Sequence, residues 1–178
     1  MHRTAISTAV CLAALSTALS SAIASGPPSR TPDAKAVPLL SQAKVSLLQG
    51  ITQTQAKYGR VIEAKFELDD SGALSLSVYA APKGYDVFDE VSGSPTSAPW
   101  KPASEVIKAR EDLVNSAFDL TIVQEGGIGL AAAVRRAVAQ QPGTPYWAVP
   151  TLHGKQPAIG IYIRSSDGKS HHLFIPVR

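Results

Sequence analysis

Residues 57–72 read KYGRVIEAKFELDDSG, and this stretch predicts the end of a helix, a β-strand and a turn in succession. Gly59 stands where a helix should end, because glycine most easily adopts the left-handed conformation of a helix C-terminal cap. The residues after it alternate in character, with Ile62, Ala64, Phe66 and Leu68 facing one side and Glu63, Lys65 and Glu67 the other. Alternation with one polar face predicts an antiparallel strand that is half exposed to water. The segment Asp69–Gly72 predicts the turn that follows.

The residues on either side of this strand predict a helix before it and two further strands after it. The whole unit is then a helix followed by a three-stranded meander. Upstream, Pro38 opens a helical pattern whose apolar stripe includes Leu40, Leu47 and Ile51. Downstream, apolar alternation predicts a second strand at residues 74–80, and a third closes at Gly93. We therefore expect one folded unit over residues 38–93.

A stretch rich in proline and serine, residues 94–102, separates this unit from a second one at residues 103–178. The second unit begins with a helical pattern from about Ser104 to Gln124 and continues with a shorter helix that contains Leu130, Val134 and Val138. Three strands are predicted after the helices, at residues 146–152, 158–164 and 171–177.

The order helix, strand, strand, strand thus occurs twice, and Gly59 corresponds to Gly143 at an offset of 84 positions. The predicted fold class is α+β, built from two lobes that each hold a helix and an antiparallel three-stranded meander. Residues 94–102 are the linker between the lobes. Whether the lobes share one sheet is left open by the pattern.

The N-terminal residues have the three regions of a secretory signal peptide. Arg3 precedes an apolar stretch from Ala5 to Leu19, and Ala22-Ile23-Ala24 supplies the small residues that a signal peptidase requires. We expect cleavage after Ala24, a periplasmic or secreted protein, and no membrane span after cleavage. An uncleaved anchor is the alternative, but the apolar stretch is short and diluted by serine and threonine. Residues 25–37, with three prolines, are predicted to form a flexible tail.

Composition narrows the classes of partner. The 178 residues include 17 Lys+Arg and 14 Asp+Glu, and the longest basic run is the pair Arg135-Arg136. Nucleic-acid binding, which requires a clustered basic stripe, is therefore not expected. The single cysteine, Cys11, lies in the predicted leader, which excludes a disulfide framework and a zinc site with several cysteines.

One glycine-rich motif invites a cofactor interpretation. Residues 127–132 read GIGLAA, which matches G-x-G-x-x-A, the phosphate-binding turn of dinucleotide sites. The required acidic residue about twenty positions later is missing, since that region holds Tyr146 and Trp147. We interpret the motif as a glycine joint between two helices and expect no cofactor.

Catalytic and metal-binding patterns are weak. The pair Ser41 and Lys44 matches S-x-x-K, but Ser166 and Lys169 match it too, which shows that the pattern arises easily by chance. Three histidines lie outside the predicted leader: His153 in a predicted turn, and His171 and His172 on opposite faces of a strand. We therefore predict no catalytic residue, no metal site and no enzymatic activity.

Three large aromatic residues, Trp100, Tyr146 and Trp147, are the candidate partner contacts. Tyr146 and Trp147 are neighbours on a predicted strand, so one should face the core and the other the opposite side. An outward aromatic ring can anchor a partner protein. The alternative is that these rings cover the edge of the core.

Residues 57–65, 70–74 and 89–93 together resemble the PepSY family. They match its helix end with glycine, its V-x-E-A strand, its D-G hairpin and its closing D-x-x-[ST]-G. The match covers residues 38–93, and the region from Thr121 to Val177 resembles a second, divergent copy without the V-x-E-A strand.

The resemblance implies an exported, non-catalytic module that inhibits or localises a peptidase, or binds another envelope protein, and it carries over no catalytic residue. Two other functions remain open. One is a small-ligand carrier that uses a cleft between helix and sheet. The other is a hydrolase with an unrecognised site, for which Ser41, His153 and His172 are the candidates.

Overall fold

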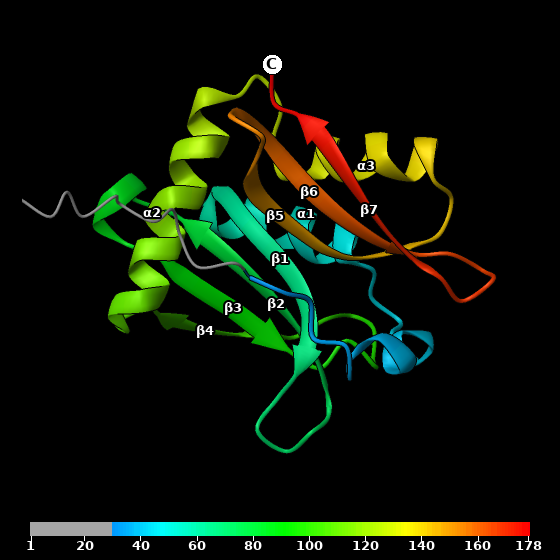
Figure 1. Ribbon diagram of the computed structural model, residues 1–178. Helices are drawn as coiled ribbons and strands as arrows, with labels where there is room; N and C mark the ends of the chain where they lie inside the picture. Colours follow the sequence, from blue (N-terminus) through cyan, green and yellow to red (C-terminus); the bar gives the residue numbers. More distant parts are fainter. Residues whose placement is uncertain (1–29) are drawn as a thin grey trace, which may run out of the picture.

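The computed structural model describes residues 30–178, and these residues form an α+β structure around one antiparallel sheet. The sheet has seven strands in the order β4-β3-β2-β1-β5-β6-β7 (Figure 1). This confirms the predicted fold class. The predicted leader, its cleavage after Ala24 and residues 25–29 of the predicted tail lie outside the described residues.

The first half of the chain supplies the 3-10 helix η1 (Val37–Gln42), α1 (Leu47–Tyr58), β1 (Arg60–Leu68), β2 (Leu74–Ala81), the short helix η2 (Gly84–Asp86), β3 (Asp89–Gly93) and β4 (Ala103–Val106). The second half supplies α2 (Arg110–Glu125), α3 (Leu130–Gln140), β5 (Thr144–His153), β6 (Gln156–Arg164) and β7 (Ser170–Pro176). Helices α1 and α3 cover one face of the sheet, and α2 crosses the other face (Figure 1).

The helical pattern that starts at Pro38 is split into two helices. The backbone amides of Lys44 and Val45 donate hydrogen bonds to the Pro95 carbonyl, at 2.8 and 3.2 Å, which pulls the chain out of the helix. Helix α1 then restarts at a capping box, in which Ser46 and Gln49 bond each other's backbone amides. It ends at Gly59, whose φ of +83° requires the glycine that the sequence provides.

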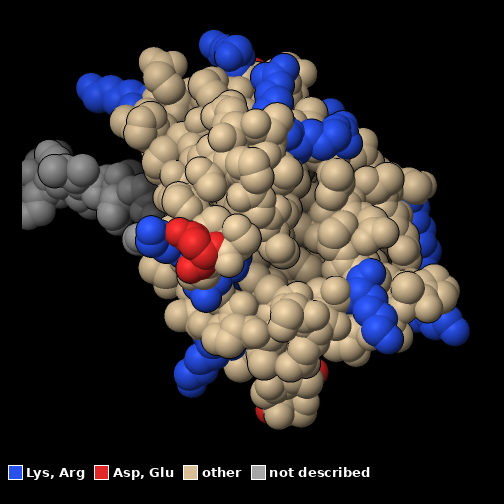
Figure 2. All heavy atoms as spheres, turned by 90° about the vertical axis from the view of Figure 1, so that its right-hand side faces the viewer, with Lys and Arg blue, Asp and Glu red and all other residues tan. Residues whose placement is uncertain are grey.

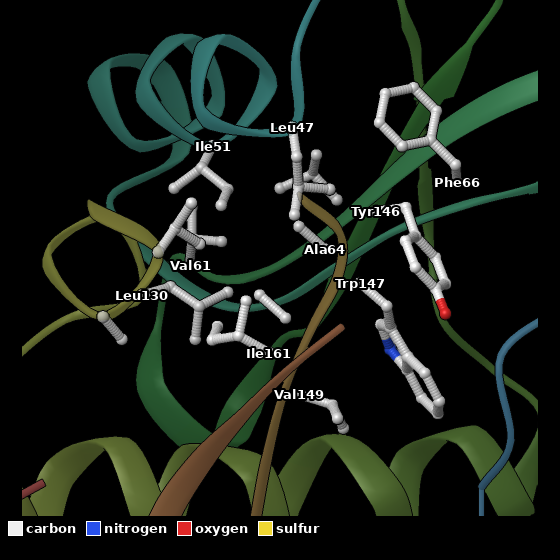
Figure 3. Close-up of a cluster of buried hydrophobic side chains, with 14 of the residues drawn as sticks. Leu47, Ile51, Val61, Ala64, Phe66, Leu130, Tyr146, Trp147, Val149 and Ile161 are labelled. Carbon is white, nitrogen blue, oxygen red and sulfur yellow. The ribbon is translucent and has the colours of Figure 1, made fainter. Parts of the chain in front are cut away.

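Strand β1 does not follow the simple alternation that its sequence predicts. A bulge between Val61 and Glu63 inserts one residue, so Ile62 packs with Leu120 of α2 instead of with α1. Ala64 stays on the α1 face, where Leu47 and Ile51 point toward it (Figure 3). The strand therefore buries apolar residues on both faces of the sheet.

The second part begins differently from the prediction. Residues 103–106, assigned by the pattern to the start of a long helix, form the edge strand β4, and α2 starts only at Arg110. The reason is pairing: Ser104 lies opposite Val91 of β3, and the Ile107 amide bonds the Phe88 carbonyl at 2.9 Å. All four residues of β4 are exposed.

The two meanders belong to one sheet, because β1 pairs with β5 through Ala64 opposite Ala148 and Lys65 opposite Trp147. Helices α1 and α3 occupy corresponding places before them, and a second bulge, between Pro145 and Trp147, recurs 84 positions after that of β1. One large hydrophobic core draws on both parts of the chain, from Ala36 to Val177. Two separate lobes are therefore not confirmed.

The described part of the predicted flexible tail is packed against the rest of the molecule. The side chain of Arg30 reaches across to the sheet, and Ala36 is only 1% exposed. Thr31, Ala34 and Lys35 are exposed, whereas the ion pairs of Arg30 hold the start of this segment against distant parts of the chain, so the flexibility of the tail stays a prediction. Residues 30–36 are called the arm below.

Candidate functional site

The three predicted partner contacts do not present their rings to solvent. Trp100, Tyr146 and Trp147 are each 3% exposed. Trp100 donates from its indole nitrogen to the Gly93 carbonyl at 3.2 Å. The bulge at Tyr146 removes the expected alternation, and the rings of Tyr146 and Trp147 both lie beside Tyr162, at 6.0 and 5.0 Å between centroids. The prediction of an outward ring at these positions is corrected.

The aromatic surface that is accessible lies next to them. On the face of β5, β6 and β7 that carries Trp147, rings follow one another in the order Trp147, Tyr162, His172, Phe174 and His153, called the aromatic row below. Tyr162 and His172 stack at 3.9 Å with 14° between their planes. His153 and Phe174 stack at 4.2 Å.

Strand alternation and one glycine create this row. Tyr162 lies opposite His172, and Gly160 lies opposite Phe174 in the β6–β7 pair. A Cβ atom at Gly160 would come within 2.8 Å of the His172 ring, so a side chain there would push that ring away. No helix lies in front of β6 and β7 in the view of Figure 1. Phe174 is 36% exposed, and both histidines of the row are exposed.

Two residues of the row, His172 and Tyr162, have pKa values shifted toward their neutral forms. Partial burial, together with the neighbouring His153, lowers the pKa of His172 below its ordinary value. Burial also raises the pKa of the Tyr162 hydroxyl. The surrounding charge is mostly positive, since residues 144–178 hold four basic side chains and a single acidic one, Asp167. Figure 2, which views the molecule from the right-hand side of Figure 1, shows Lys and Arg side chains spread among mainly uncharged residues.

At its buried end the row meets a cluster of charges. The Trp147 indole nitrogen donates to Glu63 Oε1 at 2.7 Å. Arg30 donates to Glu63 Oε2 at 2.8 Å and to both carboxylate oxygens of Asp119, at 2.8 and 2.5 Å. Arg30, Glu63 and Asp119 are called the polar centre below. They come from the arm, β1 and α2 respectively.

The polar centre is taken out of water. The residues Asp119 and Glu63 are 1% and 7% exposed. Burial raises the pKa of Asp119 well above its ordinary value, although the Arg30 guanidinium acts in the opposite direction. Burial alone would lower the pKa of Arg30, but the hydrogen bond to Asp119 and the charge of Glu63 outweigh it and raise that pKa.

Two hollows are lined in part by the arm. One, of about 240 Å³, is lined by Arg30, Glu63, Tyr79 and Asn115 among others. The other, of about 330 Å³, is lined mainly by arm residues and by the end of β1. Thr31, Lys65 and Trp147 line both hollows.

The glycine motif is a joint between helices, as predicted. Gly126 to Gly129 connect α2 to α3, and the Gly127 amide already donates to the Val177 carbonyl at 2.7 Å. A surface hollow of about 510 Å³ lies beside it. The motif follows a helix and not a parallel strand, so it lacks the setting of a dinucleotide site.

The residues of the hydrolase alternative are not assembled into a catalytic group. Ser41 is exposed on η1, whereas His153 and His172 both contact Phe174. His171 and His172 lie opposite Ile163 and Tyr162, and so on opposite faces as predicted.

A different serine lies close to a histidine, and the sequence reasoning missed it. Ser165 Oγ is 3.2 Å from His171 Nε2, and the same hydroxyl donates to Asp167. In a catalytic triad the carboxylate orients the histidine, whereas here Asp167 holds the serine and the Lys169 amide. The Ser165 hydroxyl and Lys169 amide lower the pKa of Asp167 to about 2. The arrangement stabilises the β6–β7 turn.

Within residues 30–178, no group of three or more His, Cys, Asp or Glu residues could hold a metal ion. No single helix of this part of the chain is long and apolar enough to cross a membrane. Helices α2 and α3, bent by 76° at their junction, satisfy that test of length and composition only when taken together.

The chain was compared with protein-family models, with curated proteins and with solved structures. No protein-family model matches the chain, and no curated protein matches it. Among solved structures, it is similar to a protein of Clostridium difficile 630 described as a putative lipoprotein. That similarity has 14% sequence identity and a TM-score of 0.39, and covers 76% of this chain and 88% of the other.

Proposed function

We propose that this protein is a non-enzymatic protein-binding module, and that its docking surface is the aromatic row. The observation that carries the proposal is the line of neighbouring rings on an uncovered sheet face. This line includes the exposed Phe174. Aromatic side chains that are already ordered lose little conformational entropy on binding, so they are effective anchors for a partner.

The edge of the sheet supports the same proposal. β7 is an edge strand, and its only proline is at the last position, Pro176. Unpaired backbone groups on such an edge can add a strand from a partner, while side chains next to the edge select which strand is accepted. An extended segment paired with β7 would pass directly beside His172 and Phe174.

Charge indicates the chemistry of the partner. The four basic side chains of residues 144–178 favour a partner segment that is acidic or neutral, with apolar side chains for the row. The resemblance to PepSY modules suggests an exported peptidase as that partner, and we propose inhibition or localisation of such a peptidase as the biological role. Export itself rests on the leader-like residues 1–24.

The proposal can be tested with purified protein and a panel of exported peptidases from the same source. We expect one peptidase to co-purify with the protein and to lose activity when it is added. Phe174→Ala should weaken binding at least about tenfold, which is the effect of losing a well-placed anchor. Val114→Ala is the matched control, because Val114 is 53% exposed but lies on α2.

No binding and no inhibition across the panel would count against the peptidase. Equal losses of binding for Phe174→Ala and Val114→Ala would count against the aromatic row itself. Both variants remove an exposed apolar side chain, so a difference between them reports the position and not a general loss of surface hydrophobicity.

A small-ligand carrier is a second candidate, favoured by one groove. A hollow of about 620 Å³ runs between α1 and the loop of Ala98 to Trp100, and Leu48 and Ala56 line it. It lies at the surface, whereas the space between α1 and the sheet is filled by Leu47, Ile51 and Leu76. Saturable binding of a hydrophobic dye that Ala56→Trp abolishes would support this candidate.

A further inference from the structure

The arm is held at its start by the side chain of Arg30 and at its end by Ala36, which is buried in the hydrophobic core. Arg30 bonds Glu63 and Asp119, and also approaches the Pro150 carbonyl at 3.4 Å. Asp33 accepts a hydrogen bond from the Leu68 amide at 3.0 Å. No backbone-to-backbone hydrogen bond joins residues 30–35 to a strand within the described part of the chain.

The groups that surround Arg30 belong to regular elements and are positioned without the arm. Glu63 is on β1 and is oriented by the Trp147 indole through their 2.7 Å bond, and Asp119 is on the middle of α2. Two carboxylates that accept both terminal nitrogens of one guanidinium match the planar fork of arginine better than the point charge of lysine.

Two neighbouring hollows adjoin the arm and share Thr31, Lys65 and Trp147 in their linings. Because Thr31 belongs to the arm, displacement of the arm would open the two hollows toward each other and form one cleft. The smaller hollow also contains Asn115, whose side-chain oxygen is buried and has no hydrogen-bond partner within residues 30–178. This acceptor is free to take an N–H donor that Arg30 does not supply.

We propose that this cleft is a binding site for a guanidinium group, with Arg30 as its internal occupant and residues 30–36 as a strap that a ligand can displace. The ligand class is an arginine side chain, and the source favoured by the proposed function is an arginine of a partner polypeptide. The site itself does not depend on that function, because Trp147 is the one residue of the aromatic row that lines the two hollows, and Phe174, the proposed anchor, does not line them.

The proposal rests on the free-energy cost of leaving Glu63 and Asp119 buried without a positively charged partner. Two buried carboxylates without a cation are strongly unfavourable, so each must be neutralised either by a proton or by a cation that fits the socket formed by these two residues. A tethered Arg30 acts at an effective concentration in the millimolar range, so a free ligand competes poorly with it. Removing Arg30 should therefore reveal the site.

The test is calorimetric titration of the Arg30→Ala protein with arginine amide. We expect saturable binding, at least about tenfold tighter than to the wild-type protein, as loss of the tethered competitor requires. Lysine amide should bind at least about tenfold more weakly, because it lacks the fork. Arg110→Ala, which removes an exposed arginine at the start of α2, should behave like the wild type.

Further variants assign the binding to the socket. Adding Glu63→Gln to Arg30→Ala should abolish it, and the emission of Trp147 should change on titration of Arg30→Ala but not after Trp147→Phe. A folded Arg30→Ala protein with no saturable binding of arginine amide, or with equal binding of lysine amide, would overturn the proposal.

If Arg30→Ala does not fold alone, its refolding on addition of arginine amide, followed by circular dichroism, becomes the measurement. Recovery with arginine amide but not lysine amide supports the site, and no recovery overturns it. Phe174→Ala should leave the arginine amide result unchanged in the Arg30→Ala background. Failure of the aromatic row and failure of the socket are therefore distinguishable.

Discussion

Glu63 and Trp147 occupy corresponding positions in the two meanders, 84 residues apart, and a hydrogen bond of 2.7 Å joins them. Beside them Ala64 faces Ala148, at the same offset, in the short pairing of β1 with β5. The bond therefore lies where the two halves of the sheet meet. It connects the polar centre, through Glu63, to the aromatic row, through Trp147.

Trp147→Phe should destabilise the protein more than its loss of volume implies. The variant keeps an aromatic ring but removes the N–H donor, and it leaves the buried Glu63 oxygen without that partner. A buried acceptor left unsatisfied costs about 1–3 kcal/mol in the free energy of unfolding. Urea denaturation measures this change, with Trp100→Phe as the control that loses a bond to a neutral carbonyl. Equal effects of the two variants would contradict a special role for the carboxylate.

Asp119 should make stability decrease as pH rises through the acidic range. Burial raises its pKa, so the folded chain holds the proton more tightly than the unfolded chain. The free energy of unfolding then begins to fall when the pH exceeds the ordinary pKa of aspartate. It stops falling when the pH exceeds the raised pKa of Asp119 in the folded protein. Asp119→Asn should flatten this part of the curve, while Arg30 keeps Glu63 as its partner. Thermal unfolding at a series of pH values gives the comparison, and an unchanged slope would contradict the prediction.

His172 should act in the opposite direction. The pKa of His172 is lowered in the folded protein, so the unfolded chain binds the proton more tightly. The free energy of unfolding therefore decreases as the pH falls from the ordinary pKa of histidine to the lowered pKa of His172. His172→Phe keeps a ring between Tyr162 and Phe174 and should remove this dependence. A titration followed by NMR, together with unfolding at each pH, measures it. A histidine signal that titrates above the ordinary value would contradict the prediction.

Gly59→Ala should destabilise the protein through the backbone alone. Gly59 has a φ of +83°, and no atom lies within 4 Å of the Cβ that an alanine would add. With its ψ of −124°, Gly59 lies in a positive-φ region that is almost restricted to glycine, and a residue with a side chain is strained there by about 1–3 kcal/mol. Gly129→Ala is the matched control, because Gly129 also has open space around it but a φ of −87°. Chemical denaturation should show a change of under about 0.5 kcal/mol for Gly129→Ala, as at other compatible surface positions. Equal losses would mean that φ is not the cause.

The strand and helix types could be predicted because their signals are local. The alternation in 60–68, the glycine at position 59 and the turn at Asp69 each act over a few residues, and the structure contains β1, the end of α1 and a turn there. The helix that was predicted to run unbroken from Pro38 failed for the opposite reason, because the Pro95 carbonyl that interrupts it is distant in the sequence.

The candidate site was much less predictable. Trp147 was identified as a partner contact, but strand alternation could not show that a bulge turns it toward Glu63 and Tyr162. Arg30 was assigned to a flexible tail because local composition there is rich in proline. The one signal that could have found the centre is the offset of 84, which aligns Glu63 with Trp147.

Local signals in the sequence predict the class of most elements and the α+β fold, because hydrophobic alternation and glycine positions act between near neighbours. The tertiary structure decided how the two meanders join and which side chains meet at the junction. Arg30 and Asp119 are 89 positions apart, and only the pairing of β1 with β5 and the packing of α2 bring them within hydrogen-bond distance. The residue inserted at the bulge of β5 then placed the rings of Tyr146 and Trp147 both beside Tyr162.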